Sequence, residues 1–346
     1  MVKTAVGCGL VLLLFLCVSS RPAKAQTNCF HVAAVSCGWY SLWGGPCLPQ
    51  LPAGVFGCVA NGPWEVQCYV ITNSCTSPPR HYCPTCGKGG GKVGGPINLT
   101  NGNTYIQETD VRLAGLGGGL ALERTWNSML PQDENGFQSG MFGLQWRSTY
   151  EERVFQGSGQ SSGYIVYLQA DGGLWYFNSS GVLVAPTNQS ATLTQNGTTS
   201  WTVTFQDGEK RVFSYTSGSL TSIADRNGNT TQLSYDSAGR LTTVTDPVSR
   251  HLYFSYASQT SPLVTGVTSD FGVSVSYGYD SQGRLTQVTE PDQSTLNFDY
   301  NSQSLIADVK DSQGVILESH TYDSQGRGLT SSRANGVEAV TVSYPQ

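Results

Sequence analysis

Apolar and polar residues alternate over much of the chain. At 273–279 Val or Tyr occupies every second position and Ser or Gly the positions between, and 296–300 follows the same rule with Leu, Phe and Tyr. At 120–126 Leu, Arg and Trp alternate with Ala, Glu and Thr. A period of two puts successive side chains on opposite faces of a strand. The pattern predicts strands with one apolar and one polar face.

Turn residues separate these segments. The apolar runs 164–168 and 174–177 lie on either side of Asp171-Gly172-Gly173, which predicts strand, turn and strand. Asn101-Gly102 is typical of a tight hairpin. With 41 glycines and 12% charged residues, the composition favours strands and turns over long helices. We therefore expect an all-β protein.

A tyrosine recurs every 20 to 23 residues in the C-terminal part of the chain. These marker tyrosines are Tyr215, Tyr235, Tyr256, Tyr279, Tyr300, Tyr322 and Tyr344. A fixed period of this length indicates stacked supersecondary units, because one unit cannot bury its apolar face alone. We expect the units to form one continuous sheet.

Every second unit carries a fuller motif, Y-D-S-x-G-R. The repeat-motif residues are Tyr235, Asp236, Gly239 and Arg240, then Tyr279, Asp280, Gly283 and Arg284, then Tyr322, Asp323, Gly326 and Arg327. Asp can accept hydrogen bonds from the backbone downstream of it and start a turn. Gly supplies the positive φ that other residues resist. The motif predicts a hairpin turn.

The last marker predicts an open sheet edge. If Tyr344 closes the final strand, 340–344 presents unpaired N–H and C=O groups along one side. This segment alternates Val with polar residues and carries no charge, so little prevents it from pairing with another strand.

The N-terminus is typical of a signal peptide. Lys3 precedes an apolar run at 10–16, and Ala23-Lys24-Ala25 is a cleavage site, so the mature chain should begin at Gln26. No other stretch is long and apolar enough to span a membrane. We expect a secreted or cell-surface protein with no membrane span after cleavage of residues 1–25.

The charge of the mature chain disfavours nucleic acid as a partner. Removing residues 1–25 takes away three of the 19 Lys and Arg residues, which leaves 16 basic against 24 acidic residues and a net charge of −8. Binding through phosphate contacts requires the opposite sign.

Eight of the ten cysteines cluster within residues 26–86. They are Cys29, Cys37, Cys47, Cys58, Cys68, Cys75, Cys83 and Cys86. An even number in a short exported segment predicts disulfides, although eight cysteines allow 105 pairings. The same segment holds several Trp and Tyr residues, which either pack around the disulfides or form a contact platform for a sugar or a protein.

The chain divides into five segments on this reading. Residues 1–25 are the signal peptide, 26–86 the disulfide module and 87–96 a flexible Gly-rich linker. Residues 97–215 are an irregular β region, and 216–346 are the repeats.

The Y-D-x-x-G-R units resemble the Rhs/YD-repeat family, which includes bacterial polymorphic toxins and the teneurins. Upstream, Pro96 to Asn103 is similar to the family's entry into the repeats. Arg124-Thr125-Trp126-Asn127-Ser128 and Phe142-Gly143-Leu144-Gln145-Trp146 are similar to its R-T-Y-N-S and F-G-x-x-W stretches. The resemblance covers about residues 96–346 and not the cysteine module.

The resemblance implies a β-sheet spiral that forms part of a hollow shell. In the family, the shell encloses a toxin or cargo domain, often released at a D-P-x-G site. Here Asp246-Pro247-Val248-Ser249 lacks the glycine, and Glu290-Pro291 lacks the aspartate. Seven markers are expected to form only part of a shell.

Candidate reactive patterns have simpler explanations. Gly159-Gln160-Ser161-Ser162-Gly163 fits the nucleophile elbow, but a strand rather than a helix should follow it, which favours a hairpin loop. Cys83-Pro84-Thr85-Cys86 has no second C-x-x-C pair to complete a zinc site, which favours disulfides. Asp225, Asn227 and Asn229 do not match a calcium loop and are typical of a turn. We predict no catalytic, cofactor-binding or metal-binding residues.

Two functions follow. The first is an exported structural protein, the N-terminal part of a polymorphic-toxin-like shell, whose partner is a further YD-repeat chain or a cargo or toxin domain. The second is a cell-surface module that binds a glycan or a protein. An enzyme is not expected.

Overall fold

The computed structural model describes residues 31–36, 56–60, 66–72, 92–93, 97–99, 101–130, 139–333 and 336–344. It divides into two units, Met1–Pro79 and Arg80–Gln346. In the first unit, β1 (His31–Ser36), β3 (Val66–Thr72) and β2 (Phe56–Ala60) form an antiparallel sheet in that order. Its register sets the backbone of Cys58 opposite that of Cys68. The other predicted disulfide cysteines, the signal peptide and most of the linker lie outside the described residues.

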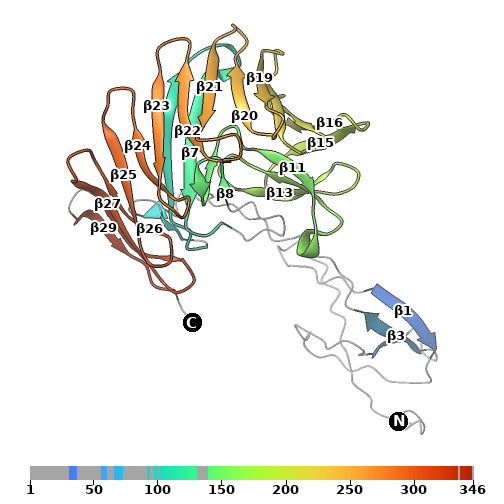
Figure 1. Ribbon diagram of the computed structural model, residues 1–346. Coiled ribbons are helices and arrows are strands. Elements are labelled where there is room, and N and C mark those ends of the chain that lie inside the picture. Colours follow the sequence, from blue (N-terminus) through green and yellow to red (C-terminus); the bar gives the residue numbers. More distant parts are fainter. Residues whose placement is uncertain are drawn as a thin grey trace. The chain divides into compact units, whose positions relative to one another are not determined.

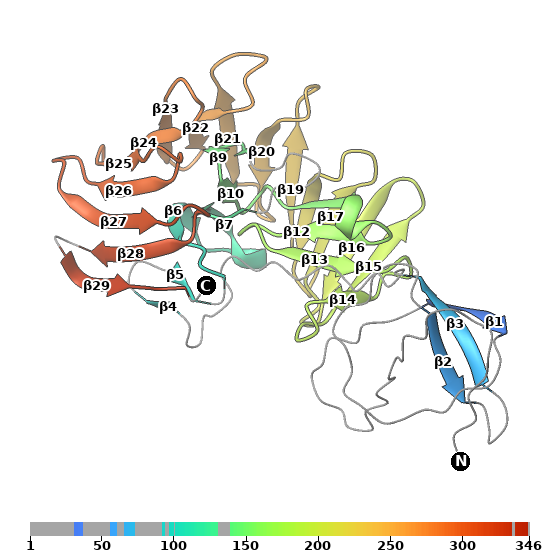
Figure 2. The same ribbon diagram turned by 90° about the horizontal axis from the view of Figure 1, so that it is seen from below.

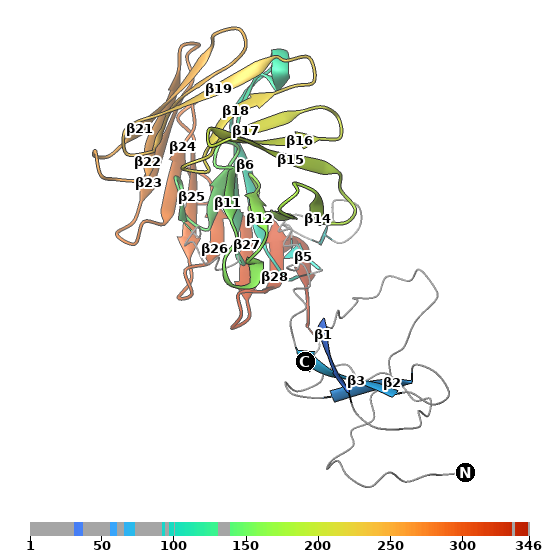
Figure 3. The same ribbon diagram turned by 90° about the vertical axis from the view of Figure 1, so that its right-hand side faces the viewer.

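The second unit is built on one long antiparallel sheet in which 15 described strands follow one another in sequence order (Figure 1). They are β15 (Ala191–Asn196), β16 (Ser200–Phe205), β17 (Lys210–Ser214), β18 (Leu220–Ala224), β19 (Thr230–Tyr235), β20 (Leu241–Thr245), β21 (His251–Tyr256), β22 (Val264–Ser269), β23 (Ser274–Tyr279), β24 (Leu285–Thr289), β25 (Thr295–Tyr300), β26 (Ile306–Lys310), β27 (Ile316–Tyr322), β28 (Gly328–Arg333) and β29 (Val337–Thr341). Figure 3 shows this succession from the side. The predicted all-β class and continuous repeat sheet are confirmed.

Shorter elements precede the long sheet. They are β4 (Lys92–Val93), β5 (Ile97–Asn98), β6 (Tyr105–Leu113), η1 (Leu116–Gly118), β7 (Leu120–Asn127), β8 (Ser139–Gly140), β9 (Gly143–Leu144), β10 (Trp146–Ser148), β11 (Arg153–Gln156), η2 (Gly159–Ser161), β12 (Ile165–Leu168), β13 (Leu174–Phe177) and β14 (Leu183–Ala185). We call the described part of 97–177 the inner segment, because the long sheet curves around its strands β6, β7 and β10 (Figure 2).

One core joins the inner segment to the long sheet. Trp126 and Trp146 of the inner segment share a buried cluster with Val275, Tyr277 and Phe298 of the sheet. In β23, Val275 and Tyr277 are buried whereas Ser274 and Ser276 are exposed, which confirms the predicted two-faced strand. The polar face of β23 therefore points away from the inner segment.

Two details differ from the sequence reading. The expected strand at 340–344 is wrong, since β29 ends at Thr341 and the Tyr344 side chain instead reaches back to Gly328. The long sheet also begins at Ala191, so it continues across residue 215 without a break. None of the helices in the described part of the chain is long and apolar enough to cross a membrane.

Candidate functional site: the repeat spine and its anchors

Each fuller motif forms a hairpin turn organised by its aspartate. Asp280 Oδ1 accepts hydrogen bonds from the backbone N–H of Gln282 at 2.9 Å and of Arg284 at 3.0 Å. Gly283 has φ +73°, which only glycine adopts without strain. Asp236 and Asp323 make the same bonds in their own turns. The geometry agrees with the turn that the motif predicts.

The arginine of the motif links one hairpin to the next. Arg284 Nε lies 2.6 Å from Asp280 Oδ2, and its guanidinium lies 4.7 Å from the ring centre of Tyr300. The other copies repeat this geometry: Arg240 lies 4.5 Å from the Tyr256 ring and Arg327 lies 4.3 Å from the Tyr344 ring. The aspartate holds the arginine, and the arginine covers the next tyrosine. We call this Asp–Arg–Tyr contact the staple.

The marker tyrosines form a second periodic contact. Tyr300 Oη donates to the carbonyl of Leu285, the first residue of the neighbouring strand, at 2.7 Å. The same bond joins Tyr235 to Leu220, Tyr256 to Leu241, Tyr279 to Val264, Tyr322 to Ile306 and Tyr344 to Gly328. The pairing register shifts immediately before Tyr300, as it does before the other markers within the sheet. The hydroxyl thus satisfies a carbonyl where the strand ladder is interrupted.

The turns at the opposite ends of the strands are also organised by aspartate side chains. Asp225 accepts from the backbone of Asn227 and Asn229, so these oxygens are engaged inside a turn, as expected. Asp246, in the D-P sequence, holds Arg250, which donates to the carbonyl of Ala114 in the inner segment at 3.1 Å. The D-P segment is therefore a turn that contacts the inner segment.

A buried ion pair anchors the inner segment to the middle of the sheet. Arg124 Nε and Nη2 lie 2.5 and 2.6 Å from the two carboxylate oxygens of Asp110, and both side chains are fully buried. Tyr277 of β23 donates its hydroxyl to Asp110 at 2.6 Å. Burial lowers the pKa of Arg124, but Asp110 more than offsets this and raises it overall. Burial and Asp110 raise the pKa of Tyr277.

Aromatic pairs extend this anchoring along the sheet. Trp146 meets Phe298 at 5.4 Å between ring centres, Tyr150 meets Phe254 at 6.3 Å, Trp126 meets Tyr322 at 6.4 Å and Phe142 meets Tyr277 at 4.8 Å. Each such edge or tilted pair adds roughly 0.5–1.5 kcal/mol beyond simple burial. The inner segment is therefore packed against strands from β21 to β27.

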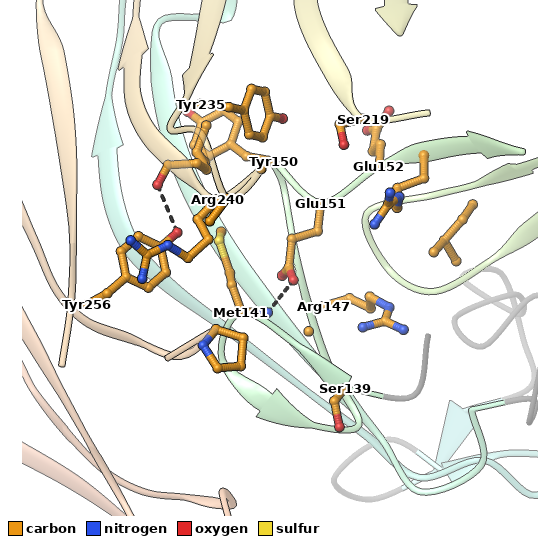
Figure 4. Close-up of a pocket in the computed structure, with 17 residues that line it drawn as sticks. Ser139, Met141, Arg147, Tyr150, Glu151, Glu152, Ser219, Tyr235, Arg240 and Tyr256 are labelled. Carbon is orange, nitrogen blue, oxygen red and sulfur yellow. Dashed lines mark hydrogen bonds between the residues drawn. The ribbon is translucent and has the colours of Figure 1, made fainter. Parts of the chain in front are cut away.

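A cavity of about 300 Å³ lies where the inner segment meets the first fuller repeat (Figure 4). Glu151 points into it and accepts a hydrogen bond from the backbone N–H of Met141. Burial raises the pKa of Glu151, and Arg147 opposes the shift. Glu152 accepts from Tyr167 Oη at 2.7 Å and lies 3.3 Å from Arg211 of β17. Glu152 therefore joins the inner segment to the sheet.

Of the other sequence candidates, Cys83-Pro84-Thr85-Cys86 lies outside the described residues. Ser161 ends the short helix η2 in the loop between β11 and β12, and its hydroxyl donates to the carbonyl of Ser158 at 2.9 Å. A strand follows, as expected for a hairpin loop. Within the described ranges, no three His, Cys, Asp or Glu side chains gather as metal ligands would.

Sequence reasoning missed the partners of Arg124 and Tyr277. Tyr277 stands at the inward position two residues before a marker tyrosine, where Phe254 and Phe298 stand in neighbouring units. A hydroxyl at a position that is phenylalanine in both neighbouring units was the available signal. Nothing in the sequence indicated that Asp110 would accept the hydrogen bond from this hydroxyl.

Two family comparisons match this region of the chain. Residues 94–177 match a domain of unknown function (DUF6531), and residues 215–250 and 263–295 match the RHS Repeat. The tRNA nuclease WapA of Bacillus subtilis (strain 168) and the tRNA3(Ser)-specific nuclease WapA of Bacillus spizizenii are each 27% identical over 150 residues. That alignment covers 43% of this chain and 6% of each relative.

Solved structures with similarity to the chain include several from Tc toxins. A crystal structure of TcdB2-TccC3-TEV is 15% identical and covers 66% of this chain and 12% of that one, with a TM-score of 0.28. A Photorhabdus luminescens Tc holotoxin pore is 12% identical and covers 67% and 14%, with a TM-score of 0.26. The repeat motifs, their geometry and the RHS Repeat match agree, which confirms the predicted resemblance of residues 215–250 and 263–295 to the Rhs/YD-repeat family.

Proposed function

We propose that this chain is an exported, non-enzymatic structural protein that forms part of an Rhs-type β shell of the polymorphic-toxin kind. The observation that carries the proposal is the repeat spine, by which we mean the series of staples and marker-tyrosine hydrogen bonds along the long sheet. The same staple and the same tyrosine bond recur along the sheet, so each hairpin positions the next. Because the contacts repeat from unit to unit, the long sheet can be extended by adding further units of the same kind.

The non-enzymatic part of the proposal rests on where polar groups are used. Asp110, Arg124 and Tyr277 bind one another, and Glu152 is held by Tyr167 and Arg211. These hydrogen bonds and ion pairs hold the long sheet to the inner segment. The nuclease activity of the WapA proteins belongs to chains of which this match covers 6%.

Export is supported by the N-terminal sequence and the cysteine cluster. The apolar run with its A-x-A site directs a chain across a membrane, and clustered cysteines suit an oxidising compartment. A shell segment outside the cell would enclose or present a cargo or toxin domain.

The proposed partner is a further YD-repeat strand at β29. Val342 N–H donates to Leu329 of β28 at 2.7 Å, so in an antiparallel pair the N–H groups of Thr341 and Ala339 point to the other side. The opposite end of the sheet is covered, because Leu193 of β15 donates to Gly181 at 2.9 Å. Among the described residues β29 is thus the accessible edge.

Light scattering of the mature protein tests this edge. We expect concentration-dependent association that Thr341→Pro abolishes, because proline removes an outward donor while the bonds to β28 remain. Thr341→Val keeps the donor and is the matched control, so it should associate like the wild type. A wild-type chain that stays monomeric at high concentration would contradict the proposed edge and favour a binding module that acts alone.

A further inference from the structure

One unit of the long sheet carries an aromatic ring on its outward face. The residue three positions before a marker tyrosine lies between two inward positions of its strand. In the units that end at Tyr235, Tyr279, Tyr300 and Tyr322 this residue is Gln232, Ser276, Asn297 or Ser319. In β21 it is Tyr253, which is 41% exposed and lies between the buried Leu252 and Phe254. The other units form the same strand with a polar residue here, so the fold does not require a ring at this position.

Two further side chains hold the Tyr253 ring in place. His251, two residues earlier on the same strand, stacks on it with the ring centres 5.6 Å apart and the planes 15° apart. Asp270, in the turn after β22, fixes His251: its Oδ2 lies 2.8 Å from Nδ1, and its Oδ1 accepts the backbone N–H of His251 at 3.1 Å. The hydrogen bond from the His251 ring lowers the pKa of Asp270, so the carboxylate is ionised at neutral pH and Nδ1 donates to it. Nε2 of the neutral imidazole is then an acceptor.

Hydroxyl groups rather than charges surround this pair of rings. Thr243 of β20 and Thr268 of β22 lie directly opposite Tyr253, and Thr245 lies opposite His251. The six strands from β19 to β24 contain no Lys, Arg, Asp or Glu. A face without charged side chains does not attract phosphate groups or strongly charged peptides. It suits an uncharged ligand that makes hydrogen bonds.

We propose that Tyr253, His251 and the threonine hydroxyls beside them form a binding site for an uncharged carbohydrate on the outward face of the long sheet. A sugar ring presents C–H groups that pack on an aromatic ring, and hydroxyl groups at its rim that need hydrogen-bond partners. Tyr253 supplies the ring, and its hydroxyl, His251 Nε2 and the threonines supply donors and acceptors. Because Asp270 already holds His251, which supports Tyr253, little side-chain freedom is lost on binding. This binding goes beyond the proposed shell role.

The size and composition of this patch favour a small ligand over a protein surface. Specific protein interfaces bury roughly 800 Å² on each partner and depend on several aromatic or apolar anchors near their centre. Tyr253 has no such companions, because no other large apolar side chain is exposed within the described strands of the long sheet. One supported ring among hydroxyl groups matches one or two sugar units of an oligosaccharide.

Calorimetric titration of the mature protein with four uncharged sugars, cellohexaose, N-acetylchitohexaose, mannohexaose and maltohexaose, tests the proposal. We expect at least one of them to bind. Tyr253→Ser, which introduces the residue of a neighbouring unit, should weaken that binding roughly tenfold or more, as the loss of an aromatic anchor does. Tyr253→Phe keeps the ring and should retain most of the affinity. Thermal melts of both variants should match the wild type, because the position is on the surface.

Two further variants locate the site. Asp270→Ala releases His251 and should weaken binding less than Tyr253→Ser, because the tyrosine ring remains. Asn297→Ser changes the same strand position two units further along and is the matched control, so it should bind like the wild type. A chain that binds none of the four sugars, or that binds them equally well after Tyr253→Ser, would overturn the proposal. Self-association that Tyr253→Ser abolishes, in a chain that binds no sugar, would identify a protein contact instead and would also overturn it.

Discussion

Replacing Asp280 with alanine should separate the energy of the staple from that of the turn. Asp280 accepts two backbone hydrogen bonds and also holds Arg284 against Tyr300. The chain offers a matched turn at Asp311, whose Oδ1 accepts from the backbone of Gln313 and Val315 at 2.9 Å each. Position 315 is valine, so that turn has no staple.

The magnitudes follow from these contacts. Each backbone bond contributes about 1 kcal/mol, so both substitutions lose roughly 2 kcal/mol. Asp280→Ala also loses a partly exposed ion pair, about 0.5 kcal/mol after solvent screening, and frees the guanidinium from the Tyr300 ring, about 0.5–1 kcal/mol. We therefore expect Asp280→Ala to cost about 1 kcal/mol more than Asp311→Ala, a roughly fivefold difference in local opening.

Native-state hydrogen exchange is the suitable assay, because long repeat arrays do not unfold as a single two-state system. Opening free energies are compared for amides of β23–β25 in Asp280→Ala and of β26–β27 in Asp311→Ala. Equal losses in the two variants, within about 0.5 kcal/mol, would refute an energetic role for the staple and leave the motif as a turn signal alone.

Two further predictions concern the anchor and the cysteine module. Tyr277→Phe should destabilise the chain by roughly 2 kcal/mol, because it removes a buried hydrogen bond to the Asp110 carboxylate, whereas Tyr279→Phe should cost about 1 kcal/mol; thermal melts of both variants compare them. Thiol titration of the denatured, unreduced mature protein should find no free thiol, and two or more reactive thiols would exclude four disulfides.

Local rules made the strands and turns predictable. Alternation at 273–279 corresponds to β23, and the runs around Asp171 correspond to β12 and β13 paired in register. The aspartate and glycine of the motif act within a few residues, so their geometry follows from their own chemistry. The final strand was misplaced because Tyr344 follows the marker pattern, yet its role is a side-chain bond to Gly328 rather than strand pairing.

Contacts between distant residues were not predictable. Arg124 was read as one face of an alternating strand, and its face was correct. Its partner Asp110 lies 14 residues away across the β6–β7 pair, and Tyr277 lies a further 167 residues from Asp110. Such pairs depend on how the sheet curves around the inner segment, which no local pattern encodes.

The staple explains why the fuller motif occupies only every second unit. An arginine at the fifth position after the marker tyrosine reaches forward to the next marker, so Arg240 covers Tyr256 and Arg284 covers Tyr300. The covered markers are followed by Ala257 and Asn301, and their turns carry no arginine. Each stapled pair of hairpins is therefore one structural unit, joined to the next pair by the tyrosine bonds and the strand ladder. The structural repeat of the long sheet is therefore a pair of hairpins, and the spacing between successive marker tyrosines corresponds to half of this repeat.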